Sequence, residues 1–109
     1  MMEKPTTKVR LKDFEIESIK QSFNKCFLPT DHLWIFGSRT NPNRRGGDID
    51  LYVETTLEPS LLFETKLAFI NAICELIGDQ RIDVVLNTIQ NSLNLPIYTK
   101  ARTEGVQLV

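Results

Sequence analysis

The sequence predicts a small α+β domain in which a mixed β-sheet is flanked by helices. Two segments carry apolar residues at helical spacing, and three short segments have strand character. The order strand, helix, strand in the second half favours a right-handed parallel crossover. The chain has 109 residues, which is the length of one domain, so no separate substrate-binding domain is expected. We treat residues 1–109 as this domain and residues 1–10 and 106–109 as candidates for flexible ends.

The composition is that of an ordinary globular domain, with 41% hydrophobic residues, 25% charged residues and a formal net charge of -1. This balance gives no global electrostatic attraction to nucleic acid, so no direct nucleic-acid binding is expected. No apolar run approaches the roughly 20 residues of a membrane span, and the polar N-terminus lacks the apolar core of a signal peptide. We therefore expect a cytoplasmic protein that does not enter a membrane.

The first organised segment, from Asp13 to Phe27, predicts an amphipathic helix. Asp13 is the expected N-cap, and Pro29 lies just beyond the expected end. The apolar residues that recur at three- and four-residue spacing are Ile16, Ile19, Phe23, Cys26 and Phe27.

The next segment, Leu33 to Phe36, is a continuous apolar run ended by Gly37, which is typical of a strand buried on both faces. His32, the single histidine, precedes it as a surface or edge residue. Neither a histidine-dependent catalytic triad nor a multi-histidine zinc site can therefore be assembled. Residues 39–47 are rich in Asn, Pro, Arg and Gly and predict a loop.

A second strand is expected from Asp48 to Glu54, where the pattern has a period of two. Ile49, Leu51 and Val53 point one way. Asp48, Asp50 and Tyr52 point the other way, so one face is apolar and the opposite face is acidic. The short loop before Asp48 favours antiparallel pairing with the preceding strand.

A second amphipathic helix follows Pro59 and Ser60, with Gly78 as its expected stop. Its predicted apolar face consists of Phe63, Leu67, Ile70, Cys74 and Ile77. Both cysteines, Cys26 and Cys74, are expected to be core thiols, since neither has a nearby Cys or His at metal-ligand spacing.

The remaining chain predicts a third strand, a shorter helix and an apolar tail. In the strand, Ile82, Val84 and Leu86 face the core and Asp83 falls on the other face. The helix is expected from Leu93 to Glu104, with Leu93, Ile97 and Ala101 along one side.

Asp48 and Asp50 are unusual residues for a buried strand, because an ionised carboxylate within a sheet carries a desolvation cost unless a cation or a set of donors compensates it. Two residues along a strand span roughly 6.6 Å, so the side chains of Asp48 and Asp50 can converge on a shared divalent ion or on an ion pair. Parallel pairing of the third strand would bring Asp83 beside them. Three carboxylates without a thiol or imidazole nearby favour a hard cation such as Mg²⁺.

The segment that joins the first two strands has the character of a phosphate site. The backbone N–H groups at Gly37 and Ser38 and the Ser38 hydroxyl can cradle a phosphate, with glycine allowing close approach. Arg39, Arg44 and Arg45 add positive charge in the same loop. A phosphate cradle beside a magnesium site supplies what attack on a nucleotide phosphate requires.

The segments "FGSR", "GGDIDLYVE" and "RIDVVL" together resemble the minimal nucleotidyltransferases, or MNT proteins, of the polymerase-beta-like superfamily. The resemblance covers nearly the whole chain. Its signature is Gly-Ser, a loop, Asp-x-Asp and a later strand aspartate; the loop between Ser38 and Asp48 has nine residues, one fewer than the commonly written form.

The resemblance implies the polymerase-beta-like nucleotidyltransferase fold and a role for each matching residue. Asp48 and Asp50 would bind Mg²⁺, in a site that holds two ions. Asp83 would complete the metal site and help to activate the acceptor hydroxyl. Gly37 with Ser38 would hold the triphosphate of ATP. Arg39 would be a secondary phosphate contact.

The family also implies a partner, since stand-alone members are commonly paired with a helical HEPN toxin. An MNT antitoxin silences that ribonuclease, in some cases by transferring AMP from ATP to a toxin tyrosine. Two other interpretations stay open: an antitoxin that binds the toxin without chemistry, and an antibiotic-modifying nucleotidyltransferase, which would normally need an added domain.

Overall fold

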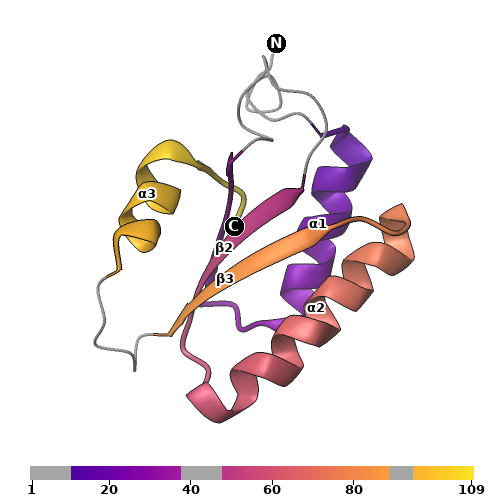
Figure 1. Cartoon of the computed structure of the whole chain (residues 1–109). Coiled ribbons are helices and arrows are strands. Elements are labelled where there is room, and N and C mark those ends of the chain that lie inside the picture. The colour runs from indigo at the N-terminus through magenta and orange to yellow at the C-terminus, as the bar shows by residue number, and fades with distance from the viewer. Residues whose placement is uncertain (1–10, 38–47, 89–94) are drawn as a thin grey trace.

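The computed structural model describes residues 11–37, 48–88 and 95–109. It is an α+β arrangement in which a four-stranded mixed sheet lies between two unequal helical layers (Figure 1). The helices are α1 (Asp13–Cys26), α2 (Leu62–Ile77) and α3 (Pro96–Glu104), with a 3-10 turn, η3 (Pro59–Leu61), leading into α2. The strands are β1 (His32–Phe36), β2 (Ile49–Thr55), β3 (Ile82–Thr88) and β4 (Val106–Gln107).

The sheet order is β3-β2-β1-β4. β1 pairs antiparallel with β2, and β2 pairs parallel with β3, as the sequence predicts. α1 and α2 cover one face of the sheet, whereas α3 packs on β1 and β2 from the other side (Figure 1). The expected helical residue Leu93 lies outside the described residues, and Leu95 is the N-cap of α3.

The expected apolar tail is instead a fourth strand. Residues 106–107 pair antiparallel with β1, and the Leu108 N–H donates to the Leu33 carbonyl at 2.8 Å. The Leu33 N–H in turn donates to the Val109 carbonyl at 3.1 Å. Pairing satisfies backbone groups along that edge of β1, while Val106 and Leu108 pack against the core. Residues 106–109 are therefore held to the sheet, and residues 1–10 lie outside the described part of the chain.

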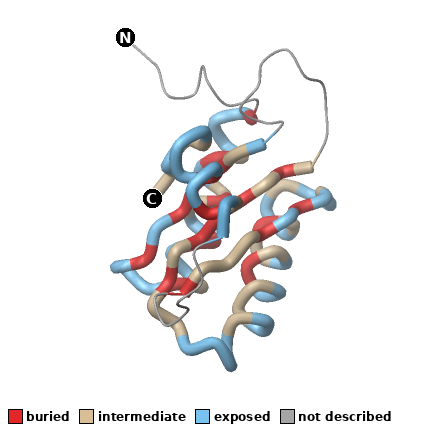
Figure 2. The backbone as a smooth tube through the Cα atoms, turned by 60° about the vertical axis from the view of Figure 1, so that its left-hand side comes forward, coloured by how far each residue is buried: buried red, intermediate tan, exposed pale blue. Residues whose placement is uncertain are grey.

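The main core lies between the sheet and the α1–α2 layer, where Figure 2 shows buried residues concentrated on the strands and inner helix faces. The predicted inner face of α1 is confirmed, since Ile16, Ile19 and Phe23 are buried. The predicted N-cap is wrong by one residue, because Lys12 is the N-cap and Asp13 the first helical residue. The Lys12 N–H donates to the Glu15 carboxylate at 2.9 Å, which satisfies a helix-start donor.

The predicted inner face of α2 is partly wrong. Phe63 is 70% exposed and Leu67 is 45% exposed, whereas Phe69 and Ile73 are fully buried. Phe69 makes edge-on ring contacts with Phe23 at 6.0 Å and with Phe27 at 5.3 Å between ring centroids. α2 is apolar on more than one side, so contacts with α1 decide which side is buried.

The cysteines and the histidine lie close to where the sequence predicts them. Cys26 and Cys74 are free and half-buried, and they pack against the edge of the core instead of inside it. His32 is exposed at the start of β1, as expected. Within residues 11–37, 48–88 and 95–109, no helix is long and apolar enough to cross a membrane.

Asp31 is a buried carboxylate that the sequence analysis did not single out. It is 1% exposed, and it accepts hydrogen bonds from the Leu28 N–H at 3.0 Å and the Thr55 hydroxyl at 2.6 Å. The Thr56 N–H and hydroxyl donate to its other oxygen at 3.0 and 3.3 Å. This network ties the start of β1 to the end of β2, far from the start of β2 where Asp48 and Asp50 lie.

Candidate active site

The register between β2 and β3 brings the predicted aspartates to one end and one face of the sheet. Asp50 is directly opposite Asp83, and Asp48 immediately precedes Ile49, which pairs with Ile82. The apolar partners of these residues face the main core, so alternation places the aspartates on the opposite face. We call Asp48, Asp50 and Asp83 the aspartate cluster.

The cluster is electrostatically unfavourable as it stands. Partial burial raises the pKa of the Asp50 carboxyl above its ordinary value, and the neighbouring charges of Asp83 and Asp48 raise this pKa further. Like charges directly opposite each other on paired strands destabilise the pairing. A cation bound between these carboxylates would therefore stabilise the cluster.

The donor set fits a hard divalent cation, because it consists of carboxylate oxygens. Among the residues that the structure describes, however, no three Asp, Glu, His or Cys side chains are close enough to hold one ion. The aspartates share a face without converging on one point. Asp50 and Asp83 are register partners on strands about 4.8 Å apart, so rotation of these two side chains can bring their carboxylates to one ion.

Gly37 directly follows β1, lies beside the cluster and has a φ of 79°, in the left-handed region that favours glycine. A Cβ at this position would overlap the Oδ2 atom of Asp50. The positive φ favours glycine here, and a Cβ would also displace the Asp50 carboxylate from its present position. The other residues predicted for the phosphate site, Ser38, Arg39, Arg44 and Arg45, lie outside the described residues.

The floor beside the cluster is aromatic. Tyr52 is fully buried and stacks on Tyr98 of α3, with 5.7 Å between ring centroids, and its ring lies 5.3 Å from that of Trp34. Its hydroxyl donates to Glu54 at 2.7 Å and accepts from the Asn87 amide at 3.0 Å. Burial raises the pKa of Tyr52 to about 12. Tyr52 is therefore protonated at neutral pH and packs beside the cluster without acting as a base.

Charged residues that the sequence analysis did not assign also lie on this face. Arg102 of α3 pairs with Glu54 at 2.5 Å, which holds α3 against β2. Arg81, just before β3, lies 3.7 Å from Asp48. The period of two could have placed Glu54 and Arg81 on the acidic face. No sequence signal could have placed Arg102, because its partner depends on how α3 packs.

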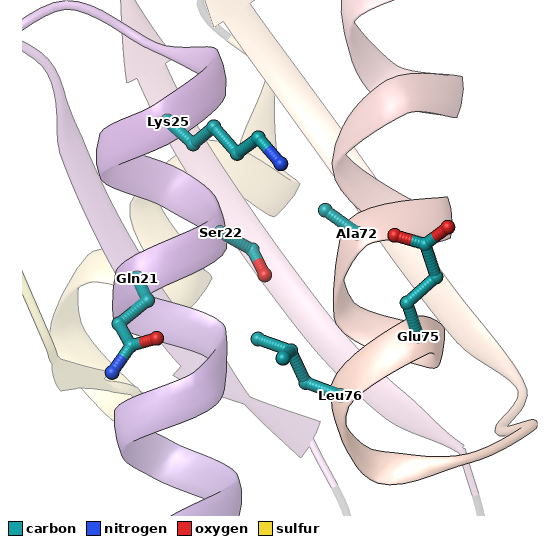
Figure 3. Close-up of a pocket in the computed structure, with 6 residues that line it drawn as sticks. All are labelled: Gln21, Ser22, Lys25, Ala72, Glu75 and Leu76. Carbon is teal, nitrogen blue, oxygen red and sulfur yellow. The ribbon is translucent and has the colours of Figure 1, made fainter.

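A separate hollow lies between α1 and α2, on the side of the sheet away from the aspartate cluster (Figure 3). Its lining residues are Gln21, Ser22, Lys25, Ala72, Glu75 and Leu76. The Ser22 hydroxyl donates to the Ser18 carbonyl at 2.9 Å, so it is engaged within its own helix. The hollow has one acidic residue, Glu75, and so lacks the several carboxylates that share a face in the aspartate cluster.

The geometry therefore presents one acidic, aromatic-floored surface at the β2–β3 end of the sheet. No protein-family model matches this chain, and no curated protein matches it.

Proposed function

We propose that this protein is a Mg²⁺-dependent nucleotidyltransferase that moves AMP from ATP to a hydroxyl group of a partner protein. The observation that carries the proposal is the register of β2 and β3, which sets Asp50 opposite Asp83 with Asp48 on the same face. Two facing carboxylates raise the free energy of the fold unless a cation lies between them. Asp50, Asp83 and Asp48 would hold the ion.

Bound Mg²⁺ would supply charge neutralisation at the triphosphate and orientation of the reacting groups. The acceptor oxygen attacks the α-phosphorus, and a new oxygen–phosphorus bond forms. The bond from the α-phosphorus to the bridging oxygen breaks, so pyrophosphate leaves. The acceptor proton passes to a carboxylate, and Asp83 is the candidate because its side chain is exposed at the edge of the cluster.

The resemblance to MNT proteins suggests that the acceptor is a tyrosine of a HEPN-type toxin, and that adenylylation silences it. This would make the protein an antitoxin as well as an enzyme. A separate surface, on the α2 side of the sheet and away from the aspartate cluster, is compatible with protein docking, since Leu61, Phe63 and Leu67 are exposed apolar residues on η3 and α2.

The test is transfer of label from ATP carrying a labelled α-phosphate, with Mg²⁺, in a host extract supplemented with the candidate toxin. Wild type should label one protein, and the double variant Asp48→Asn, Asp50→Asn should label none. Mass spectrometry then identifies the acceptor residue. Transfer to an aminoglycoside without a protein acceptor would instead support an antibiotic-modifying enzyme.

A second candidate function is neutralisation of the toxin by binding alone. It is favoured by the 70% exposure of Phe63, because a ring so exposed is a candidate anchor for a protein partner. Under this alternative, Asp48→Asn leaves toxin binding and neutralisation unchanged, whereas Phe63→Ala weakens both. Under the enzymatic proposal, Asp48→Asn abolishes neutralisation even where binding persists.

A further inference from the structure

Arg81 lies across from Asp48 at the edge of the aspartate cluster. The Ile49 N–H donates to the Arg81 carbonyl at 2.9 Å, which fixes the Arg81 backbone at the start of the β2–β3 pairing. Since side chains alternate along a strand, Arg81 and Asp83 project from the same face. Among the described residues, Arg81 therefore places a cation beside Asp48 and on the same face as Asp83.

The ion pair between Arg81 and Asp48 is loose. The Nε atom lies 3.7 Å from Oδ2, which is too long for a hydrogen bond, and the Arg81 side chain is 83% exposed. Ion pairs this exposed contribute little to stability. A guanidinium has five N–H donors in a planar fork, and the approach of Nε to Asp48 at 3.7 Å is not a hydrogen bond. The contact with Asp48 thus uses little of what Arg81 can offer an anion.

Asp48 is also among the residues proposed above to hold Mg²⁺, so the metal and Arg81 compete for the same carboxylate. Mg²⁺ and Arg81 do not compete for a polyphosphate, which presents several anionic oxygens. A planar guanidinium binds phosphate with two parallel hydrogen bonds, a geometry that a single loose carboxylate contact does not use.

We infer that Arg81 exchanges partners: it pairs with Asp48 in the metal-free protein and contacts a phosphate of the nucleoside triphosphate when Mg²⁺ occupies Asp48. This inference rests on the proposed function and names a substrate-binding residue beyond the aspartates. It predicts two effects of opposite sign for Arg81→Gln. Mg²⁺ alone should bind about twofold to fivefold more tightly, because a competing cation is gone. Mg²⁺-ATP should bind about tenfold more weakly, because a charged phosphate contact is lost.

The test is isothermal titration calorimetry on the full chain, first with MgCl₂ alone and then with a non-hydrolysable ATP analogue in saturating Mg²⁺. Arg81→Lys should lose less of the nucleotide affinity than Arg81→Gln, since it keeps the charge without the fork. Lys25→Gln is the matched control, because Lys25 is an exposed cation of α1 on the other side of the sheet (Figure 3). Both affinities should be unchanged in that control.

The outcomes separate this inference from the proposal beneath it. Opposite shifts in the two affinities support the exchange of partners. Losses of affinity for both Mg²⁺ and the nucleotide would show that Arg81 only maintains the fold. Unchanged affinities would show that Arg81 affects the binding of neither ligand. Either result overturns the inference about Arg81, while binding of both ligands by the wild type still supports the proposed function. A wild type that binds neither Mg²⁺ nor Mg²⁺-nucleotide overturns both.

Discussion

Replacing Asp50 by Asn should stabilise the metal-free protein, because the change removes a charge and keeps the shape. Asp50 and Asp83 are partners on neighbouring strands, which lie about 4.8 Å apart. Two unit charges at that separation repel by about 1 kcal/mol in water, and by more where solvent is partly excluded. We expect the free energy of unfolding at pH 7 to rise by about 1 kcal/mol, which corresponds to about 4–8 °C in Tm for a domain of this size.

The pH dependence has a defined sign. The pKa of Asp50 is raised in the folded state above its ordinary value of 3.8. The folded state therefore holds the Asp50 proton more tightly than the unfolded state does. The resulting contribution to the free energy of unfolding is fully present below pH 3.8, and it is lost as the pH rises through the folded-state pKa. Wild type and Asp50→Asn should have similar stabilities in acid, and wild type should fall behind as the pH increases.

The assay is urea unfolding followed by the fluorescence of Trp34, in chelator and then in millimolar Mg²⁺. Added Mg²⁺ should stabilise wild type and leave Asp50→Asn nearly unchanged, since only a ligand bound to the native state shifts the equilibrium. Asp79→Asn, an exposed turn residue, is the matched control and should change the free energy of unfolding little. A loss of more than 1 kcal/mol in Asp50→Asn at pH 7 would refute the reasoning and make Asp50 a structural residue.

Four further substitutions test the packing and the site. Gly37→Ala should cost about 1–2 kcal/mol in urea unfolding because of its positive φ, and it should also displace the Asp50 carboxylate and reduce Mg²⁺ binding; normal binding would contradict the close approach described above. Asp31→Asn should cost about 2–3 kcal/mol, since an amide cannot accept all the hydrogen bonds that the carboxylate does; a neutral effect on unfolding would show that water replaces them. Phe69→Ala should cost about 3–5 kcal/mol and Phe63→Ala less than about 0.5 kcal/mol, and equal costs would mean that the buried side of α2 is misassigned.

Much of the sheet could be predicted because alternation along a strand is a local signal. The period of two from Asp48 to Glu54 assigned both faces of β2, and the strand-helix-strand order indicated the parallel partner of Asp83. The face of α2 could not be assigned in the same way. Its sequence offers several apolar stripes, and the burial of Phe69 depends on contacts with distant residues, including the rings of Phe23 on α1 and of Phe27 just after it.

Contacts between segments distant in the chain account for the other differences. β4 has only two residues, too few for a periodic signal, and it exists because the edge of β1 offers hydrogen-bonding partners. The pair formed by Glu54 and Arg102 joins a strand to a helix 48 positions later. Local patterns thus predicted which residues face the site from the sheet, while the residues that reach it from α3 depend on packing.

The register of β2 against β3 determines both which apolar residues enter the main core and which aspartates lie together on the opposite face. A slip of one residue would turn Asp83 into the main core and Ile82 out to solvent, because side chains alternate with every step. Burying that charge would cost several kcal/mol, so the misaligned sheet is strongly disfavoured. Substitutions at Ile82 or Val84, which touch no ligand, can therefore impair metal binding by loosening this alignment. A screen that scores only loss of activity would then identify such core positions as though they belonged to the site.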